Sequence, residues 1–146
     1  MPEMWSLKYE PGTMNQPGIA GLAASTEYIL QRGVESFAKR KNELSVHLME
    51  ELKKMEGISI YAENPKENLC GVVSFSVSRL PTEDVGYVLQ ESFDIRVRTG
   101  LHCAPLIHKA LGTFPEGTVR VSFSAFNTHE EVDAFMQGLN TLKDVT

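Results

Sequence analysis

The chain has 146 residues, of which 42% are hydrophobic and 23% charged, and its formal net charge is −5. These proportions are ordinary for a single globular domain with a buried core. The negative charge argues against a nucleic-acid partner, which normally requires a basic patch. No apolar run approaches the roughly 18 residues that cross a bilayer, and the N-terminus lacks a signal-peptide pattern. We therefore expect no membrane partner and a cytoplasmic location.

The only cysteines are Cys70 and Cys103. Two cysteines are too few for a disulfide scaffold or a structural zinc site, so we expect free thiols and no metal. Cys70 opens the apolar run Cys70-Gly71-Val72-Val73, which predicts a small buried hydrophobic side chain.

Prolines and glycines are frequent in residues 1–18, which predicts an irregular arm that packs on another surface or frays. Apolar residues at helical spacing then predict a helix that begins near Ile19 and ends at Gly33. A longer helix is expected from about Val34 to Met55, with Gly57 as its stop.

After Gly57 the pattern alternates between short strands and helices. The expected strands are Ile58–Tyr61, Val72–Val77, Ile95–Arg98 and Val119–Ser124, with a polar turn at residues 63–68. Two helices are expected between these strands, one capped by Thr82 that reaches Ser92 and one from Pro105 to about Leu111. A last helix is expected to open with a capping box at Thr128 and Glu131. Its buried stripe would consist of Val132, Phe135, Met136 and Leu139. Residues 19–146 are thus predicted to form one α/β (α+β) two-layer sandwich, with helices on a short, mainly antiparallel sheet.

Cys103 occupies a position that favours chemistry. It follows the strand end at Arg98-Thr99-Gly100 and precedes the helix that Pro105 begins. A free thiol is only a few per cent ionised at neutral pH, and the thiolate is the nucleophile. A helix N-terminus, Arg98 and His102 would each favour the thiolate if they lie close. The local sequence therefore leaves two interpretations, a reactive thiol or a buried structural cysteine.

Three sequence blocks resemble one enzyme family. Arg98-Thr99-Gly100-Leu101-His102-Cys103-Ala104-Pro105 resembles the Arg-Thr-Gly-His-His-Cys-Ala motif of group II cysteine desulfurases and selenocysteine lyases. These are pyridoxal-phosphate (PLP) enzymes of the class V aminotransferase family, fold type I. Two further segments resemble family blocks in the same order, namely Tyr9 to Ile19 and Val119 to Thr128. The chain thus looks like the small C-terminal domain of such an enzyme.

The resemblance implies a role for each matching residue. Cys103 would attack the sulfur of a cysteine–PLP adduct and become a persulfide, releasing alanine, and the substrate would be cysteine or selenocysteine. Arg120 would hold the substrate carboxylate, and Arg98 and His102 would stand beside the nucleophile. Gly12 and Thr13, in the arm, would reach the PLP phosphate of the other subunit of a homodimer. A protein that accepts the sulfur is a possible partner.

Two departures from the family matter. Leu101 stands where the desulfurases usually carry a histidine. The Schiff-base lysine of the family lies in a large domain upstream of the segments matched here, and we interpret His108-Lys109 as a solvated helix face. We therefore expect the isolated chain to bind no PLP tightly and to be inactive. Two alternatives stay open: an aminotransferase or other PLP lyase in which Cys103 is not catalytic, and a sulfur-carrier or binding module that works without PLP.

Overall fold

A computed structural model describes residue 9 and residues 12–61 and 70–143. The polar turn expected at residues 63–68 lies outside these. The chain divides into two compact units, residues 1–36 and residues 37–146, and each is described by itself. Over the described residues, no helix combines the length and apolar character needed to cross a membrane.

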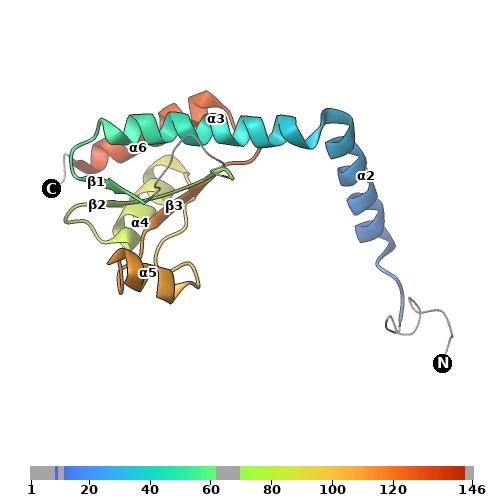
Figure 1. The fold of residues 1–146 in the computed structure, drawn as a ribbon, viewed down its shortest axis with the longest axis horizontal. Helices are drawn as coiled ribbons and strands as arrows, with labels where there is room; N and C mark the ends of the chain where they lie inside the picture. The colour runs from blue at the N-terminus through green and yellow to red at the C-terminus, as the bar shows by residue number, and fades with distance from the viewer. Residues whose placement is uncertain (1–8, 10–11, 62–69, 144–146) are drawn as a thin grey trace. The chain divides into compact units, whose positions relative to one another are not determined.

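The first unit contains helix α2 (Gln16–Arg32) (Figure 1). The Asn15 side chain caps it by accepting a hydrogen bond from the Gly18 amide at 3.1 Å, and Pro17 stands in its first turn. These two start signals explain why the helix begins inside the segment that we expected to be irregular. The predicted break at Gly33 is confirmed, since this residue has a φ of 81° and its amide bonds the Ile29 carbonyl.

The second unit is built on an antiparallel sheet of β1 (Ile58–Ile60), β2 (Val72–Val77) and β3 (Val119–Ser122), in that order. Phe75 pairs with Ile60 on one side and with Val119 on the other. The bounds predicted for β2 are confirmed. This arrangement, with helices packed on it, is the predicted two-layer fold.

The strand predicted at residues 95–98 is wrong. A single bridge joins Arg98 to Arg120, and before it the chain stays unpaired. The reason lies at the end of α4 (Thr82–Phe93), where Asp94 adopts a left-handed conformation. The Ile95 amide then bonds the Leu89 carbonyl at 3.0 Å, so this part of the backbone completes a helix cap instead of a sheet.

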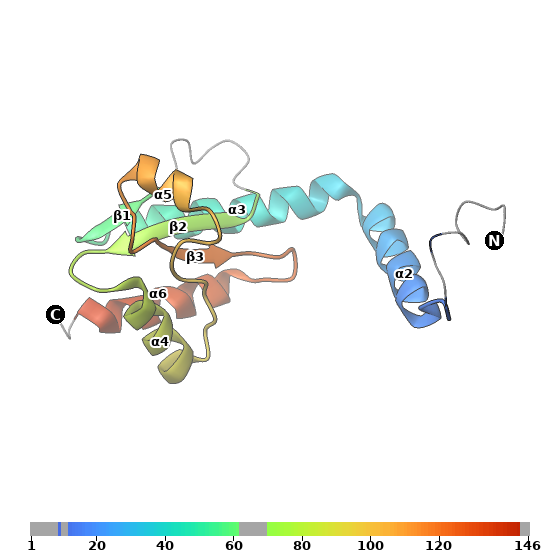
Figure 2. The same cartoon turned by 90° about the horizontal axis from the view of Figure 1, so that it is seen from below.

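Figures 1 and 2 show how the helices cover the sheet. Helix α3 (Val34–Lys53), from Phe37 onward, and α6 (His129–Lys143) lie on one face, α4 lies beside β3 and α6, and α5 (Pro105–Leu111) lies on the opposite side. The core is apolar and continuous between the helices and the sheet. Phe75 and Phe135 meet edge to face with ring centroids 6.1 Å apart. Around them are buried Leu44, Leu48, Leu52, Val73, Val85, Leu89, Val119, Val132 and Leu139.

The two predicted helix starts have different outcomes. The capping box of α6 is confirmed, because the Thr128 amide bonds the Glu131 carboxylate at 2.9 Å and the Glu131 amide bonds the Thr128 hydroxyl at 3.4 Å. Thr82, however, lies inside α4 and caps nothing. Its amide bonds Glu116 Oε1 at 2.8 Å and its hydroxyl bonds the Glu116 carbonyl at 3.2 Å. A carboxylate from a distant loop thus replaces the local cap.

Candidate active site around Cys103

The site begins at the bridge between Arg98 and Arg120. The amide of each residue bonds the carbonyl of the other, at 3.1 and 2.7 Å. Directly opposed residues of an antiparallel pair project their side chains from the same face. One short stretch of backbone pairing therefore brings together two guanidinium groups that are far apart in the sequence.

The Cys103 loop, which we define as residues 99–104, connects Arg98 to α5. Its backbone is strained, because His102 and Cys103 have positive φ values of 52° and 60°, a region that residues with side chains seldom occupy. The Cys103 side chain is exposed, and the Arg98 Nη2 atom lies 3.3 Å from its sulfur. An accessible thiol beside a permanent cation is the setting of a reactive cysteine rather than of packing material.

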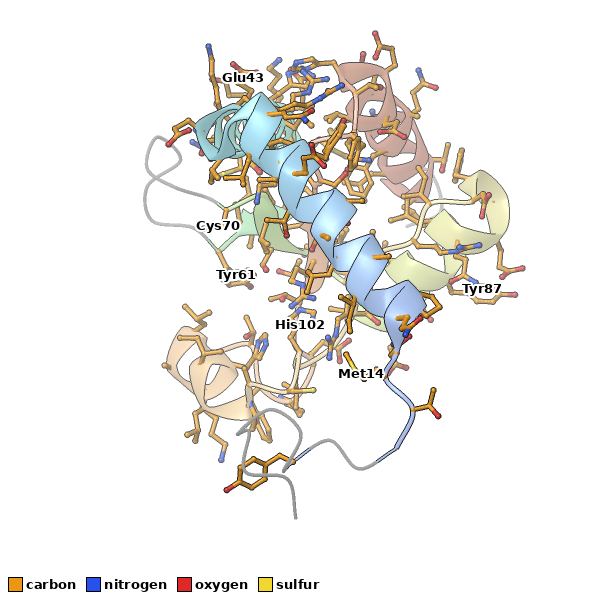
Figure 3. All side chains as sticks on the ribbon, turned by 90° about the vertical axis from the view of Figure 1, so that its right-hand side faces the viewer. Met14, Glu43, Tyr61, Cys70, Tyr87 and His102 are labelled. Carbon is orange, nitrogen blue, oxygen red and sulfur yellow. The ribbon has the colours of Figure 1, made fainter. Side chains whose placement is uncertain are left out.

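His102 is held between the sheet and α5, where Figure 3 labels it. Its Nε2 atom is hydrogen-bonded to the Thr118 hydroxyl at 3.0 Å, and its ring centroid lies 5.6 Å from that of His108. Burial lowers the pKa of His102 below 6.5, and the nearby charges of Arg120, His108 and Arg98 lower this pKa further, against an opposing effect of the Thr118 backbone. A neutral imidazole at pH 7 supplies no positive charge, so the cation next to the Cys103 sulfur is the Arg98 guanidinium.

Two buried polar atoms in this region have no partner among the described residues, namely Arg120 Nε and His102 Nδ1. Buried polar atoms are nearly always hydrogen-bonded, and those that are not often mark a functional site. A guanidinium with an unused N–H can bind a carboxylate through two parallel hydrogen bonds. The geometry therefore offers a group on β3, beside the Cys103 loop, that is suited to binding a carboxylate.

Two further sequence predictions are wrong. Cys70 is exposed instead of buried, because it stands in a turn with a φ of 49° before β2 begins. The pair His108 and Lys109 is not a uniformly solvated face. Lys109 is exposed, but His108 is only 3% exposed, and its Nδ1 atom bonds the Thr113 hydroxyl at 2.7 Å. On this short helix the histidine faces the Cys103 loop.

Sequence reasoning missed two further residues of the site, His108 and Thr118. A threonine one place before an apolar strand carries no local signal of function. Its importance arises from its buried contact with His102, 16 positions away in the chain.

Comparison with known proteins places this site in a family. The family model described as aminotransferase class-V matches residues 3–135. The chain belongs to the aminotransferase class-V family. A probable cysteine desulfurase of Xylella fastidiosa is 35% identical to it over 132 residues, which are 90% of this chain and 30% of that protein. The chain spans about a third of the length of the curated relatives it matches.

Solved structures of the family have the same fold. The apo cysteine desulfurase from Thermococcus onnurineus NA1 aligns with a TM-score of 0.84 at 35% identity, over 95% of this chain and 34% of that one. The cysteine desulfurase CsdA (S-sulfonic acid) from Escherichia coli aligns with a TM-score of 0.81 at 25% identity, over 94% of this chain and 33% of that one. The chain is thus a class V domain of the cysteine desulfurase type.

The described residues fit one side of the cofactor site that the class V family implies. Arg120 and Cys103 suit a substrate carboxylate and a substrate sulfur. Among the lysines whose burial the structure describes, none is buried, and Lys109, the lysine nearest to Cys103 in the sequence, points its ammonium at Phe114, 5.1 Å from the ring centroid. We therefore assign none of these lysines to the Schiff base of the cofactor.

The two residues that resemble the family's phosphate-binding pair belong to the first unit. Gly12 and Thr13 are exposed and lie before α2. Gly12 has a φ of 124°, and a Cβ there would meet nothing within 4 Å. A glycine in this conformation keeps its backbone accessible to a ligand, which is compatible with the expected contact.

Proposed function

We propose that this chain is the small domain of a PLP-dependent cysteine desulfurase in which Cys103 takes the sulfur of L-cysteine. The observation that carries the proposal is the exposed Cys103 thiol with the Arg98 guanidinium 3.3 Å from its sulfur. PLP, when bound, supplies the electron sink that weakens the bond between Cβ and sulfur in the substrate.

The sulfur transfer balances without any further reactant. The Cys103 thiolate attacks the sulfur of the substrate cysteine, and an S–S bond forms as the substrate's C–S bond breaks. The electron pair of the broken bond stays with the carbon, which takes up a proton, so the products are alanine and a persulfide on Cys103. The role of the Arg98 guanidinium is to favour the attacking thiolate by its charge.

The other site residues bind the substrate, position the Cys103 loop or contact the cofactor. Arg120 binds the α-carboxylate, which its buried and unpartnered Nε supports. His102 orients the loop as a neutral group. Gly12 and Thr13 contact the PLP phosphate of the neighbouring subunit of a homodimer, and the accessible backbone at Gly12 supports this.

The persulfide needs an acceptor, and we propose a protein that receives sulfur from Cys103. Selenocysteine has the same polar groups as cysteine and is an alternative substrate. Both cysteines of the chain are free thiols, which is compatible with the reducing cytoplasm in which we place the protein.

The test is Cys103→Ala in the full-length protein, with Cys70→Ala as the matched control. The control removes the other exposed thiol, which lies outside the site. We expect Cys103→Ala to abolish cysteine-dependent sulfide release with alanine formation, and Cys70→Ala to keep it. An aminotransferase, or a lyase that does not use Cys103, would retain activity in both variants, and that result would refute the proposal.

A sulfur carrier that works without PLP would give a different result. The chain would gain the mass of one sulfur atom on Cys103 from a persulfide donor, and the full-length protein would release no alanine from cysteine. That pair of outcomes would replace the desulfurase proposal.

A further inference from the structure

We propose that Thr118 is a positioning residue that holds the Cys103 loop in its strained conformation and so keeps the thiol against Arg98. This inference rests on the proposed nucleophilic role of Cys103. It concerns the loop at residues 113–118, which we call the supporting loop and which runs from the end of α5 to the start of β3.

The Cys103 loop needs external support because its own bonds are few. Within it, one backbone hydrogen bond joins the Ala104 amide to the Leu101 carbonyl at 2.8 Å. His102 and Cys103 both occupy the left-handed region, which costs about 1–2 kcal/mol for each residue that carries a side chain. Such a conformation persists only where the surrounding structure holds it.

Thr118 supplies that support at two points. Its amide bonds the Gly100 carbonyl at 3.1 Å, and its hydroxyl is hydrogen-bonded to His102 Nε2 at 3.0 Å. The first bond holds the start of the Cys103 loop, and the second holds the residue immediately before the thiol. Thr118 is itself 1% exposed, so water has little access to replace either bond.

The neighbours of Thr118 also pack closely against the Cys103 loop. Gly117, with a φ of 80°, packs so closely on the backbone of Gly100 that a Cβ would overlap its carbonyl group. The His102 ring also contacts the ring of His108. His108 is in turn hydrogen-bonded to Thr113, at the other end of the supporting loop from Thr118. His102 is thereby held from both ends of residues 113–118.

The supporting loop is in turn attached to the rest of the unit. Glu116 bonds the first residue of α4 through both its carboxylate and its carbonyl. The contacts of Thr118 therefore join the Cys103 loop to a supporting loop that is itself held by α4. Loss of the hydroxyl would free the His102 ring, let the positive φ values relax, and lengthen the contact between Arg98 and the thiol.

The experiment compares Thr118→Val with Thr118→Ser in the 146-residue chain. Valine keeps the shape and removes the hydroxyl, whereas serine keeps the hydroxyl. The readout is the rate of iodoacetamide alkylation at Cys103 and at Cys70, separated by peptide mass mapping. Cys70 is an exposed thiol in the same chain and serves as the internal reference. Ser45→Ala, which removes another buried hydroxyl from α3, is the matched control.

We expect Thr118→Val to slow alkylation of Cys103 by about threefold or more, because this factor corresponds to the net contribution of one buried hydrogen bond to stability. The alkylation rate of Cys70 should not change. Thr118→Ser should stay within about twofold of the wild type, and Ser45→Ala should leave the ratio of the two thiols unchanged. The His102 ring signals in an NMR spectrum should shift in Thr118→Val and return in Thr118→Ser.

Three outcomes would overturn the inference. The ratio of the Cys103 and Cys70 alkylation rates could stay unchanged in Thr118→Val, or Thr118→Ser could slow Cys103 alkylation as much as Thr118→Val does. The alkylation rates of both thiols could also change by the same factor, as they would after a general loss of folding. A wild-type Cys103 no more reactive than Cys70 would instead count against the proposed function itself. The two failures are therefore distinguishable in one set of measurements.

Discussion

The Arg98 guanidinium lies 3.3 Å from the sulfur of Cys103, five residues further along the chain. The contact depends on the backbone bridge between Arg98 and Arg120, which fixes the start of the Cys103 loop. A cation that cannot lose its proton thus stands at the thiol while the neighbouring imidazole of His102 is neutral at pH 7.

Replacing Arg98 by methionine should slow the alkylation of Cys103 at neutral pH by up to about fivefold, because a solvent-exposed charge contact contributes about 0.2–1 kcal/mol. Alkylation of Cys70 in the same sample should not change. Arg96→Met is the matched control, since Arg96 is an exposed arginine that pairs with Asp94 at 3.5 Å. The Arg98 effect should shrink in 1 M salt. Equal effects of the two substitutions would contradict the assignment.

The lowered pKa of His102 gives a pH dependence of stability with a definite sign. The unfolded chain takes up a proton near the ordinary value of 6.5, whereas the folded chain resists it to a lower pH. The contribution of His102 to the free energy of unfolding should therefore be fully present above pH 6.5. It should decline as pH falls below 6.5. Urea denaturation at pH 7.5 and 5.5 measures this decline, and His102→Asn should reduce it. An identical decline in the variant would assign it to other groups.

Two glycines with similar backbone angles should respond differently to alanine. Gly112 has a φ of 72° and no atom within 4 Å of a built Cβ, whereas Gly117 has a φ of 80° and meets the Gly100 carbonyl. Gly112→Ala should cost about 1–2 kcal/mol of unfolding free energy from the backbone alone. Gly117→Ala should cost about 1–3 kcal/mol more from the overlap. The two variants can be compared by their denaturant midpoints. Equal losses of unfolding free energy would mean that Gly117 is not in close contact with the backbone of Gly100.

The capping box of α6 should contribute to stability as a unit. Thr128→Ala should lower the unfolding free energy by about 1 kcal/mol, and combining it with Glu131→Ala should cost less than the sum of the two single changes. Asn140→Ala, on the exposed face of the same helix, is the control. Additive losses in urea denaturation would show that the two residues act separately.

The capping box also predicts a loss of stability in acid. Hydrogen bonds from the Asn127 side chain and the Thr128 backbone lower the pKa of Glu131 below 4.5. Its contribution should therefore be present above that value and disappear as pH falls through the lower folded-state value. The difference in unfolding free energy between wild type and Glu131→Ala should be smaller in acid than at pH 6.

Elements that depend on neighbouring residues were predictable from the sequence. The alternation of Val72–Val77, the proline that begins α5 and the capping box of α6 are all confirmed. The helix start at Gln16 was missed because the glycines and prolines around it favour a turn as readily as a first helical turn. The strand expected at residues 95–98 has the right residue types, but its first amide is used by the cap of α4.

By itself, the sequence determined the fold class, the order of the three family blocks and the identity of the candidate nucleophile. Hydrophobic periodicity, caps and motifs are local properties, so they can be read along the chain. Only the tertiary structure decided which thiol has a cationic neighbour, that Cys70 is exposed and His108 buried, and that Thr118 holds His102. Residues 118 and 102 are 16 positions apart, and Thr82 and Glu116 are 34 apart. Contacts at such separations depend on how the packed elements meet, which no local pattern encodes.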